Sequence, residues 1–182
     1  GIPCFALEDD ADKKQSILCS RSFGQGVTSK QEIKEAVATH VTSCARKLRQ
    51  QGSACEVLEI FYRTSPFENE GRASMHAQRA FLSPTNDSME MIQAAMEMVD
   101  QTFRAGLVYK KAGAQVGHLV DERESQLALF SPAPSGRDEL MRAMDAINTR
   151  FGKDTVRSAS LGTTAKKHWV RRSEMCSPLY TT

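Results

Sequence analysis

The chain has 182 residues, enough for one good-sized core or for a domain of roughly 100–130 residues with a tail. Its 40% hydrophobic and 25% charged residues are the balance of an ordinary globular protein, and the net charge of +2 is too small to indicate a nucleic-acid partner by itself. No apolar run approaches the roughly 20 residues that span a bilayer, so we expect no membrane partner. Five cysteines without C-x-x-C spacing favour reduced thiols and a cytoplasmic protein.

The first third of the chain predicts a linker, a strand, a helix and a second strand. Residues 1–19 predict the linker, because residues 8–14 are too polar to pack, while Ile17 and Leu18 lead into structure. Residues 20–23 predict a short strand that Gly24 and Gly26 break. Ser29 and Glu32 have the spacing of a capping box, in which both side chains bond free amides at a helix start. Apolar residues then recur at helical spacing until Gly52. They are Ile33, Val37, Val41, Cys44 and Leu48.

Two further strands and a helix are expected between residues 54 and 120. Residues 54–64 are rich in β-branched and aromatic side chains and predict a strand. Its alternation places Leu58, Ile60 and Tyr62 on one face and Glu59, Phe61 and Arg63 on the other. A loop over 67–77 and a strand over 78–83, closed by Pro84, come next. A helix begins near a cap-like Asp87, and a last strand over 107–120 bends at Gly113 or Gly117.

The order strand–helix–strand–strand–helix–strand predicts an α+β fold, with a four-stranded antiparallel sheet and two helices on one face. The other face of the sheet is then open, and we expect several basic residues of the four strands to share it. The candidates are Arg21, Arg63, Arg79, Lys110 and Lys111. With nearby hydroxyl groups, such a face suits DNA phosphates. For any one of these residues, a solvated strand charge is the simpler interpretation.

Residues 121–136 predict a flexible segment that contains a docking peptide. The pentapeptide Gln126–Phe130 lies between an acidic run and a Pro/Ser/Gly run, and neither flank can pack beside it in a core. Leu127, Leu129 and Phe130 would fill a partner's pocket, while the Gln126 amide sets the register. The alternative is an edge strand or turn that packs on its own domain.

Residues 137–182 predict a third helix followed by an irregular extension. We expect Ser135 to cap this helix and Gly152 to end it. The apolar face of the helix comprises Leu140, Met141, Met144, Ile147 and Phe151. The remainder contains the single Trp of the chain and has poor periodicity.

Several motifs in order resemble the UmuC group of Y-family translesion DNA polymerases, from about residue 2 to the end. They are Cys19–Gly24, Arg63–Phe67, Tyr109–Gly113, Trp169–Met175 and Ser177–Thr182. The resemblance implies that residues 20–120 form a little-finger domain, which grips the backbone of template-primer DNA. The implied DNA contacts are Ser20, Arg21, Ser22, Arg63, Thr64, Ser65, Arg79, Lys110 and Lys111. It also implies that Gln126, Leu127, Leu129 and Phe130 dock on the bacterial sliding clamp.

The chain shows no phosphate loop, nucleophile elbow, H-E-x-x-H motif or paired acidic motif, so it predicts no catalytic residue and no metal or cofactor. The resemblance implies that the palm, with its catalytic carboxylates and Mg²⁺, lies outside this chain. Polymerase activity in SOS damage tolerance then belongs to the parent protein. A UmuD-type partner dimer and a recombinase filament are further implied partners, with no residue here that identifies their surfaces.

A different class of function also fits the residues. The chain could be a non-catalytic interaction module that binds single-stranded RNA or DNA on the open sheet face. This alternative needs exposed aromatic side chains there, and Phe23, Phe61 and Phe81 are the candidates. A preference for single strands over a primer-template duplex would support it.

Overall fold

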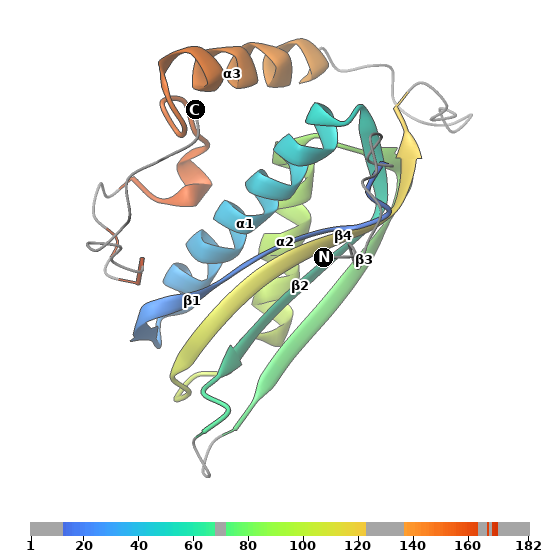
Figure 1. Cartoon of the computed structure of the whole chain (residues 1–182). Helices are drawn as coiled ribbons and strands as arrows, with labels where there is room; N and C mark the ends of the chain where they lie inside the picture. The colour runs from blue at the N-terminus through green and yellow to red at the C-terminus, as the bar shows by residue number, and fades with distance from the viewer. Residues whose placement is uncertain (1–12, 68–71, 123–136, 164–166, 168, 171–182) are drawn as a thin grey trace, which may run out of the picture.

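The structure is a computed structural model that describes residues 13–67, 72–122, 137–163, 167, 169 and 170 (Figure 1). Its elements follow the predicted order and then continue into the extension. They are β1 (Ile17–Val27), α1 (Lys30–Gln50), β2 (Ser53–Thr64), β3 (Ser74–Thr85), α2 (Ser88–Thr102), β4 (Tyr109–Asp121), α3 (Arg137–Phe151) and the 3-10 turn η1 (Ala159–Leu161).

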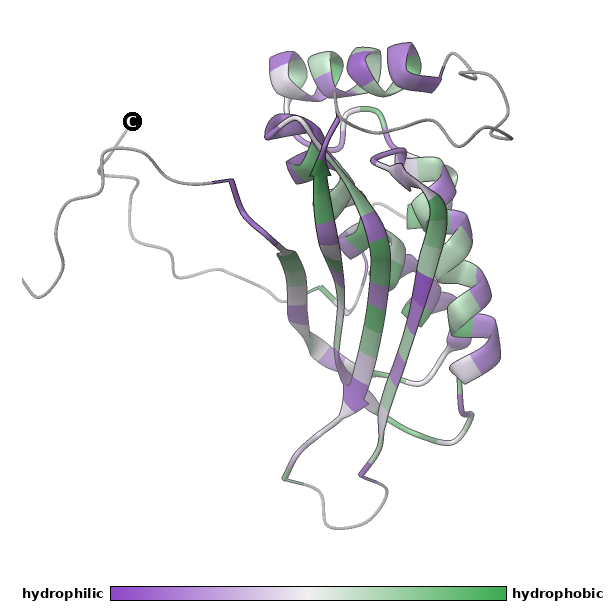
Figure 2. Cartoon of the chain, turned by 90° about the vertical axis from the view of Figure 1, so that its right-hand side faces the viewer, coloured by the Kyte–Doolittle hydropathy of each residue, from purple (hydrophilic) through white to green (hydrophobic). Residues whose placement is uncertain are grey.

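The four strands form one sheet in the order β1-β4-β2-β3, and every neighbouring pair is antiparallel. Helices α1 and α2 lie side by side on one face of this sheet (Figure 1). The predicted α+β fold is therefore confirmed. Hydrophilic and hydrophobic residues form bands along the strands (Figure 2), as expected for strands with one covered and one uncovered face.

The core lies between the helices and the covered face. Ile33 and Leu48 of α1 are fully buried, as are Leu58, Ile60 and Tyr62, the three residues predicted to share one face of β2. The Tyr62 hydroxyl lies 2.7 Å from the Thr102 hydroxyl of α2, so the polar end of this buried ring is satisfied.

The two helix starts use different means of capping. Helix α1 begins after Ser29 as predicted, but the Ser29 side chain makes no capping hydrogen bond, so the part of the predicted capping box assigned to Ser29 is wrong. Instead, the Ser29 carbonyl accepts the first helical bond from the Ile33 N–H. At α2 the prediction is confirmed, because the Asp87 carboxylate accepts a bond of 2.8 Å from the Met89 N–H.

Both edge strands are longer than predicted. Strand β1 begins at Ile17, inside the predicted linker, and continues through Gly24 and Gly26. Strand β3 begins at Ser74, inside the predicted loop, and contains Pro84. Gly24 and Gly26 of β1 and Pro84 of β3 were expected to break their strands. They lie where the pairing register shifts, on strands at the two edges of the sheet. An edge strand tolerates a missing N–H or a bulge because it has a hydrogen-bonded neighbour strand on one side only.

Strand β4 departs from regular geometry at His118, whose φ is 51°, rather than at either predicted glycine. Gly113 remains paired with Ser20 on one side and Phe61 on the other. The irregularity lies beside Gly117, between the pairs Val57–Gly117 and Cys55–Leu119.

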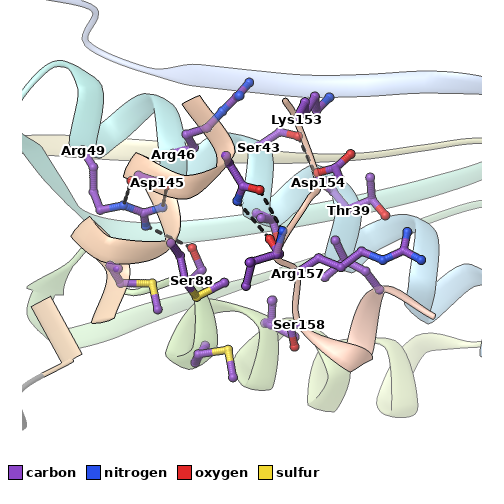
Figure 3. A pocket seen from close by; sticks show the side chains of 18 residues that line it. Thr39, Ser43, Arg46, Arg49, Ser88, Asp145, Lys153, Asp154, Arg157 and Ser158 are labelled. Carbon is purple, nitrogen blue, oxygen red and sulfur yellow. Dashed lines mark hydrogen bonds and ion pairs between the residues drawn. The ribbon is translucent and has the colours of Figure 1, made fainter. Parts of the chain in front are cut away.

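The extension packs beside α1. Helix α3 ends at Phe151 and is followed by Gly152 at a φ of 106°, as predicted, whereas its expected cap Ser135 lies outside the described residues. Arg49 of α1 donates two bonds, of 2.6 and 2.9 Å, to Asp145 of α3 (Figure 3). The docking peptide Gln126–Phe130 also lies outside the described residues. In the described part of the chain, no helix is both long and apolar enough to cross a membrane.

Candidate nucleic-acid interface

One row of side chains across the open face carries two of the predicted cations. Arg63 of β2 pairs with Lys111 of β4 and with Ser74 of β3, and Lys111 also pairs with Ser22 of β1. Arg63 alternates with the buried Tyr62, and Lys111 with the buried Ala112, so this row faces away from the helices. A serine therefore flanks the two cations on each side.

A bulge adds Lys110 to the same face. Thr64 pairs with Tyr109 and Arg63 with Lys111, which leaves Lys110 as the extra residue of β4. Strict alternation would place Lys110 and Lys111 on opposite faces. Because Tyr109 and Ala112 are both buried against the helices, the two lysines between them share the open face. We call Arg63, Lys110 and Lys111 the cationic end of the open face.

Two of the predicted cations lie on the covered side instead. Arg79 pairs with the buried Leu58 and donates a bond of 2.7 Å to Glu97 of α2, which lowers the pKa of that carboxyl group. Arg21 lies two residues from both Cys19 and Phe23, so it shares the face of these buried side chains, and it pairs with the buried Ala112 of β4. Of the five strand cations, several of which were expected on the open face, Arg21 and Arg79 do not lie there, because register and alternation turn them toward the helices.

The predicted hydroxyl groups do not all lie on the open face. Ser20 and Ser22 alternate with buried residues of β1 and lie on the open face. Thr64 is buried, and its hydroxyl accepts a bond of 3.0 Å from the Ala73 N–H. The Ser65 hydroxyl accepts a bond of 3.3 Å from the Phe67 N–H. Thr64 and Ser65 thus order the turn after β2.

In the row beside the cationic end, a glycine leaves space for an aromatic ring. Gly113 lies between Ser20 and Phe61, and a Cβ at Gly113 would be 2.4 Å from Cζ of Phe61 and 2.6 Å from Cβ of Ser20. The Phe61 ring therefore lies across β4. Phe23 is buried on the helix side, and Phe81 packs against the core, so Phe61 is the one of the three predicted aromatic residues that faces outward.

The open face changes from cationic to mixed along the strands. The next row contains Leu18, Gln115, Glu59 and Gln78, and the Glu59 carboxylate lies 3.5 Å from Nε2 of His76. The positive charge is therefore concentrated at the end near the β2–β3 connection. Ser74 was not singled out from the sequence, whereas Lys110 lies on the open face, as proposed from it. Strict alternation would have placed Lys110 and Lys111 on opposite faces, and a run of two lysines before a small-residue strand was the only local signal for the bulge.

Catalytic chemistry has no comparable geometry in the described residues. They contain no group of three or more His, Cys, Asp or Glu side chains that could hold a metal ion. A cleft between α1, α2 and α3 is lined by charges of both signs, among them Arg46, Lys153, Asp154 and Arg157 (Figure 3). Its remaining carboxylate, Asp145, already accepts both bonds from Arg49.

Comparison with known families identifies the family to which the chain belongs. The model described as "impB/mucB/samB family C-terminal domain" matches residues 14–129. The chain belongs to this family. A second family model, described as "Domain of unknown function (DUF4113)", matches residues 138–182, which are the extension.

Relatives match the whole chain but are longer than it. The chain is 40% identical to Protein UmuC and 36% identical to Protein SamB, both of Salmonella typhimurium, over 100% of this chain and 43% of each relative. It therefore spans less than half the length of these relatives. The resemblance to the UmuC group is confirmed.

Two solved structures are similar to the chain at low identity. One is described as a complex of beta-clamp processivity factor and little finger domain of PolIV, at 15% identity and a TM-score of 0.44, covering 64% of this chain and 99% of that one. The other is an insertion ternary complex of Dbh DNA polymerase, at 8% identity and a TM-score of 0.45, covering 61% of this chain and 31% of that one.

Proposed function

We propose that this chain is the DNA-gripping and sliding-clamp-docking part of a translesion DNA polymerase of SOS damage tolerance. The observation that carries the proposal is the cationic end of the open face, in a chain that belongs to the impB/mucB/samB family. The polymerase activity, its Mg²⁺ and the catalytic domains are proposed for the longer parent protein. A UmuD-type dimer and a recombinase filament remain proposed partners of that parent.

The cationic end is suited to a phosphate backbone rather than to bases. Arg63, Lys110 and Lys111 supply charge, while Ser22 and Ser74 supply hydroxyl donors in the same row. Contacts of this kind position a duplex without reading its sequence. Binding should therefore be independent of sequence and should weaken steeply as salt is raised.

The DNA part of the proposal is tested with a fluorescently labelled primer-template duplex, titrated over a series of salt concentrations. Arg63→Ala and Lys111→Ala should weaken binding of all sequences alike, and each should reduce the slope of log K against log salt by roughly 0.9 per lost phosphate contact. Arg79→Ala is the matched control, since it removes a strand cation from the helix side. Equal losses from Arg79→Ala, or a changed sequence preference in Arg63→Ala, would contradict phosphate binding by the open face.

The clamp part of the proposal depends on the peptide Gln126–Phe130 and on its resemblance to the family's docking peptide. Burial of Leu127, Leu129 and Phe130 supplies roughly 5–8 kcal/mol at about 1.5–3 kcal/mol per side chain. Ordering a tail opposes a large part of this gain. We therefore expect an affinity of order micromolar, since ~8 kcal/mol corresponds to about 1 μM. Because the docking peptide is joined to a DNA-binding domain, a high effective concentration raises the overall affinity for a clamp on DNA.

Titration of the chain against a bacterial sliding clamp tests this part. The double variant Leu129→Ala/Phe130→Ala should abolish binding, whereas Ala128→Ser, at a position expected to face solvent, should retain it. Binding that survives the double variant would show that another surface contacts the clamp.

The alternative function, binding of single-stranded RNA or DNA on the open sheet face, has less support from the structure than from the sequence. Modules that bind single strands on a sheet stack two or three bases on aromatic side chains. In the described residues, Phe61 faces outward, while Phe23 and Phe81 pack on the helix side. A chain that bound single-stranded DNA or RNA more tightly than the primer-template duplex, with loss on Phe61→Ala, would restore this alternative.

A further inference from the structure

The extension reaches the edge of the sheet through Trp169. The Gly24 N–H of β1 donates a bond of 2.9 Å to the Trp169 carbonyl. The Trp169 ring is 7% exposed and makes an edge contact with the Phe23 ring, at 5.8 Å between centroids. The indole is therefore part of the core, although it belongs to the segment that matches the domain of unknown function.

Contacts with α1 hold this part of the extension in place. The Lys167 ammonium lies 3.8 Å from the Glu35 carboxylate, 5.1 Å from the centroid of the Trp169 ring, and donates to the Leu161 carbonyl. Gly162, at a φ of 86°, leaves space for the same carboxylate, because a Cβ there would lie 2.4 Å from an oxygen of Glu35. Leu161 is buried beside α1.

The segment of β1 that Trp169 contacts is the one that opposes Lys110. Ser22 pairs with Lys111 and Val27 with Tyr109, so residues 23–26 form a bulge opposite the single residue Lys110. At the other end of this bulge, a Cβ on Gly26 would lie 3.3 Å from Nζ of Lys110 and 2.3 Å from Cγ1 of Val108. The β1 bulge thus contacts the extension at Gly24 and the cationic end at Gly26.

We propose that Trp169 is a positioning residue for DNA binding, which acts by holding the β1 bulge against Lys110. The inference rests on the proposed function. A bulge on an edge strand has few ladder bonds of its own, so its conformation depends on what else contacts it. The Trp169 contacts order the bulge before DNA binds. The conformational entropy lost in ordering the bulge therefore does not lower the affinity for DNA. By linkage, DNA at Lys110 stabilises the docked extension to the same degree.

The chain contains a single Trp, so its intrinsic fluorescence reports on the docked extension directly. We expect saturating primer-template DNA to reduce quenching of this fluorescence by acrylamide in the wild type. Lys110→Ala should remove this protection at an equal degree of DNA saturation. Unchanged quenching in the wild type, with DNA bound, would overturn the proposed coupling.

Affinity measurements test the reciprocal effect. Trp169→Ala should bind DNA about fivefold more weakly, at the lower end of usual coupling between sites, and with a smaller salt slope. Trp169→Phe keeps an aromatic ring against Phe23 and should restore most of the affinity. Gly26→Ala disturbs Lys110 from the other end of the bulge, so it should weaken DNA binding while the emission of Trp169 stays native.

Lys111→Ala separates failure of this inference from failure of the proposed function. If Lys111→Ala weakens DNA binding while Trp169→Ala and Gly26→Ala do not, the positioning role is wrong and the DNA-binding function stands. If none of the three variants weakens binding, the proposed function is wrong as well. If Trp169→Ala does not fold, Gly26→Ala and the quenching experiment decide the matter.

Discussion

Helices α1 and α3 both carry apolar residues at helical spacing, but they are held by different forces. Nine residues of α1 are buried, because the sheet offers a continuous apolar surface beneath it. In α3, Met141 alone is buried, while Leu140 and Phe151 are 49% and 66% exposed. Directional ion pairs, Arg49–Asp145 and Arg137–Asp87, attach α3 to the rest of the molecule. An apolar stripe thus predicts a helix, while the burial of that stripe depends on which surface is left for it.

The largest expected difference between the two helices is in the free energy of unfolding. Ile33→Ala on α1 leaves a cavity under a fully buried side chain and should lower stability by about 2–5 kcal/mol. Leu140→Ala on α3 is the matched control and should change stability by less than about 0.5 kcal/mol. Urea unfolding followed by circular dichroism measures both. Similar losses in the two variants would show that α3 is packed as tightly as α1.

A second difference should depend on pH. Burial, together with the positive charges of Arg21 and of Lys153 just beyond α3, lowers the pKa of His40 on α1 to about 4. In the unfolded chain a histidine takes up its proton near pH 6.5. Between these values the unfolded state binds more protons, so stability rises with pH there, by on the order of 3 kcal/mol from pH 4 to pH 7.

The measurement is the free energy of unfolding in urea at several pH values. His40→Gln should flatten the rise between pH 4 and pH 6.5. The control His76→Gln removes a histidine from the open face, and the wild-type rise should remain in it. A slope that persists in His40→Gln would assign the pH dependence to other groups.

A smaller effect is expected from the ion pair that joins the helices. Asp145→Asn removes the charge that accepts two bonds from Arg49, whose side chain is 12% exposed. Hydrogen bonds to charged groups contribute about 1.5–3 kcal/mol, so α3 amides should exchange with deuterium roughly 10-fold faster or more, while the sheet amides change little. Asp138→Asn, an exposed carboxylate on the same helix, is the control. Unchanged exchange in Asp145→Asn would mean that Met141 and the Arg137–Asp87 pair suffice to hold α3.

The smallest effect should come from the outer face of α3. Phe151 is 66% exposed, and its ring contacts the Arg150 guanidinium at 5.2 Å. An exposed contact of this kind contributes about 0.5–1 kcal/mol at most, so Phe151→Ser should leave the unfolding midpoint almost unchanged. A large loss of stability would reveal that Phe151 packs against a part of the chain outside the described residues.

Much of the fold was predictable because its signals are local. The apolar spacing of α1, the Asp87 cap of α2 and the alternation of β2 each depend on neighbours a few residues away. The edge strands were predicted too short, since Gly24, Gly26 and Pro84 are strand breakers in a central strand but not on an edge. Whether a strand lies at an edge is a property of the whole sheet.

The sequence by itself determined the order of elements, the separation of Leu58, Ile60 and Tyr62 from Arg63, and the family resemblance. The tertiary structure alone decided which cations share a face. Arg79 turns toward α2, and a one-residue bulge brings Lys110 beside Lys111. Register between strands far apart in the chain sets these positions, and a shift by a single residue reverses the face of a side chain. For the same reason, only the folded chain shows that Trp169 lies against the bulge that faces Lys110.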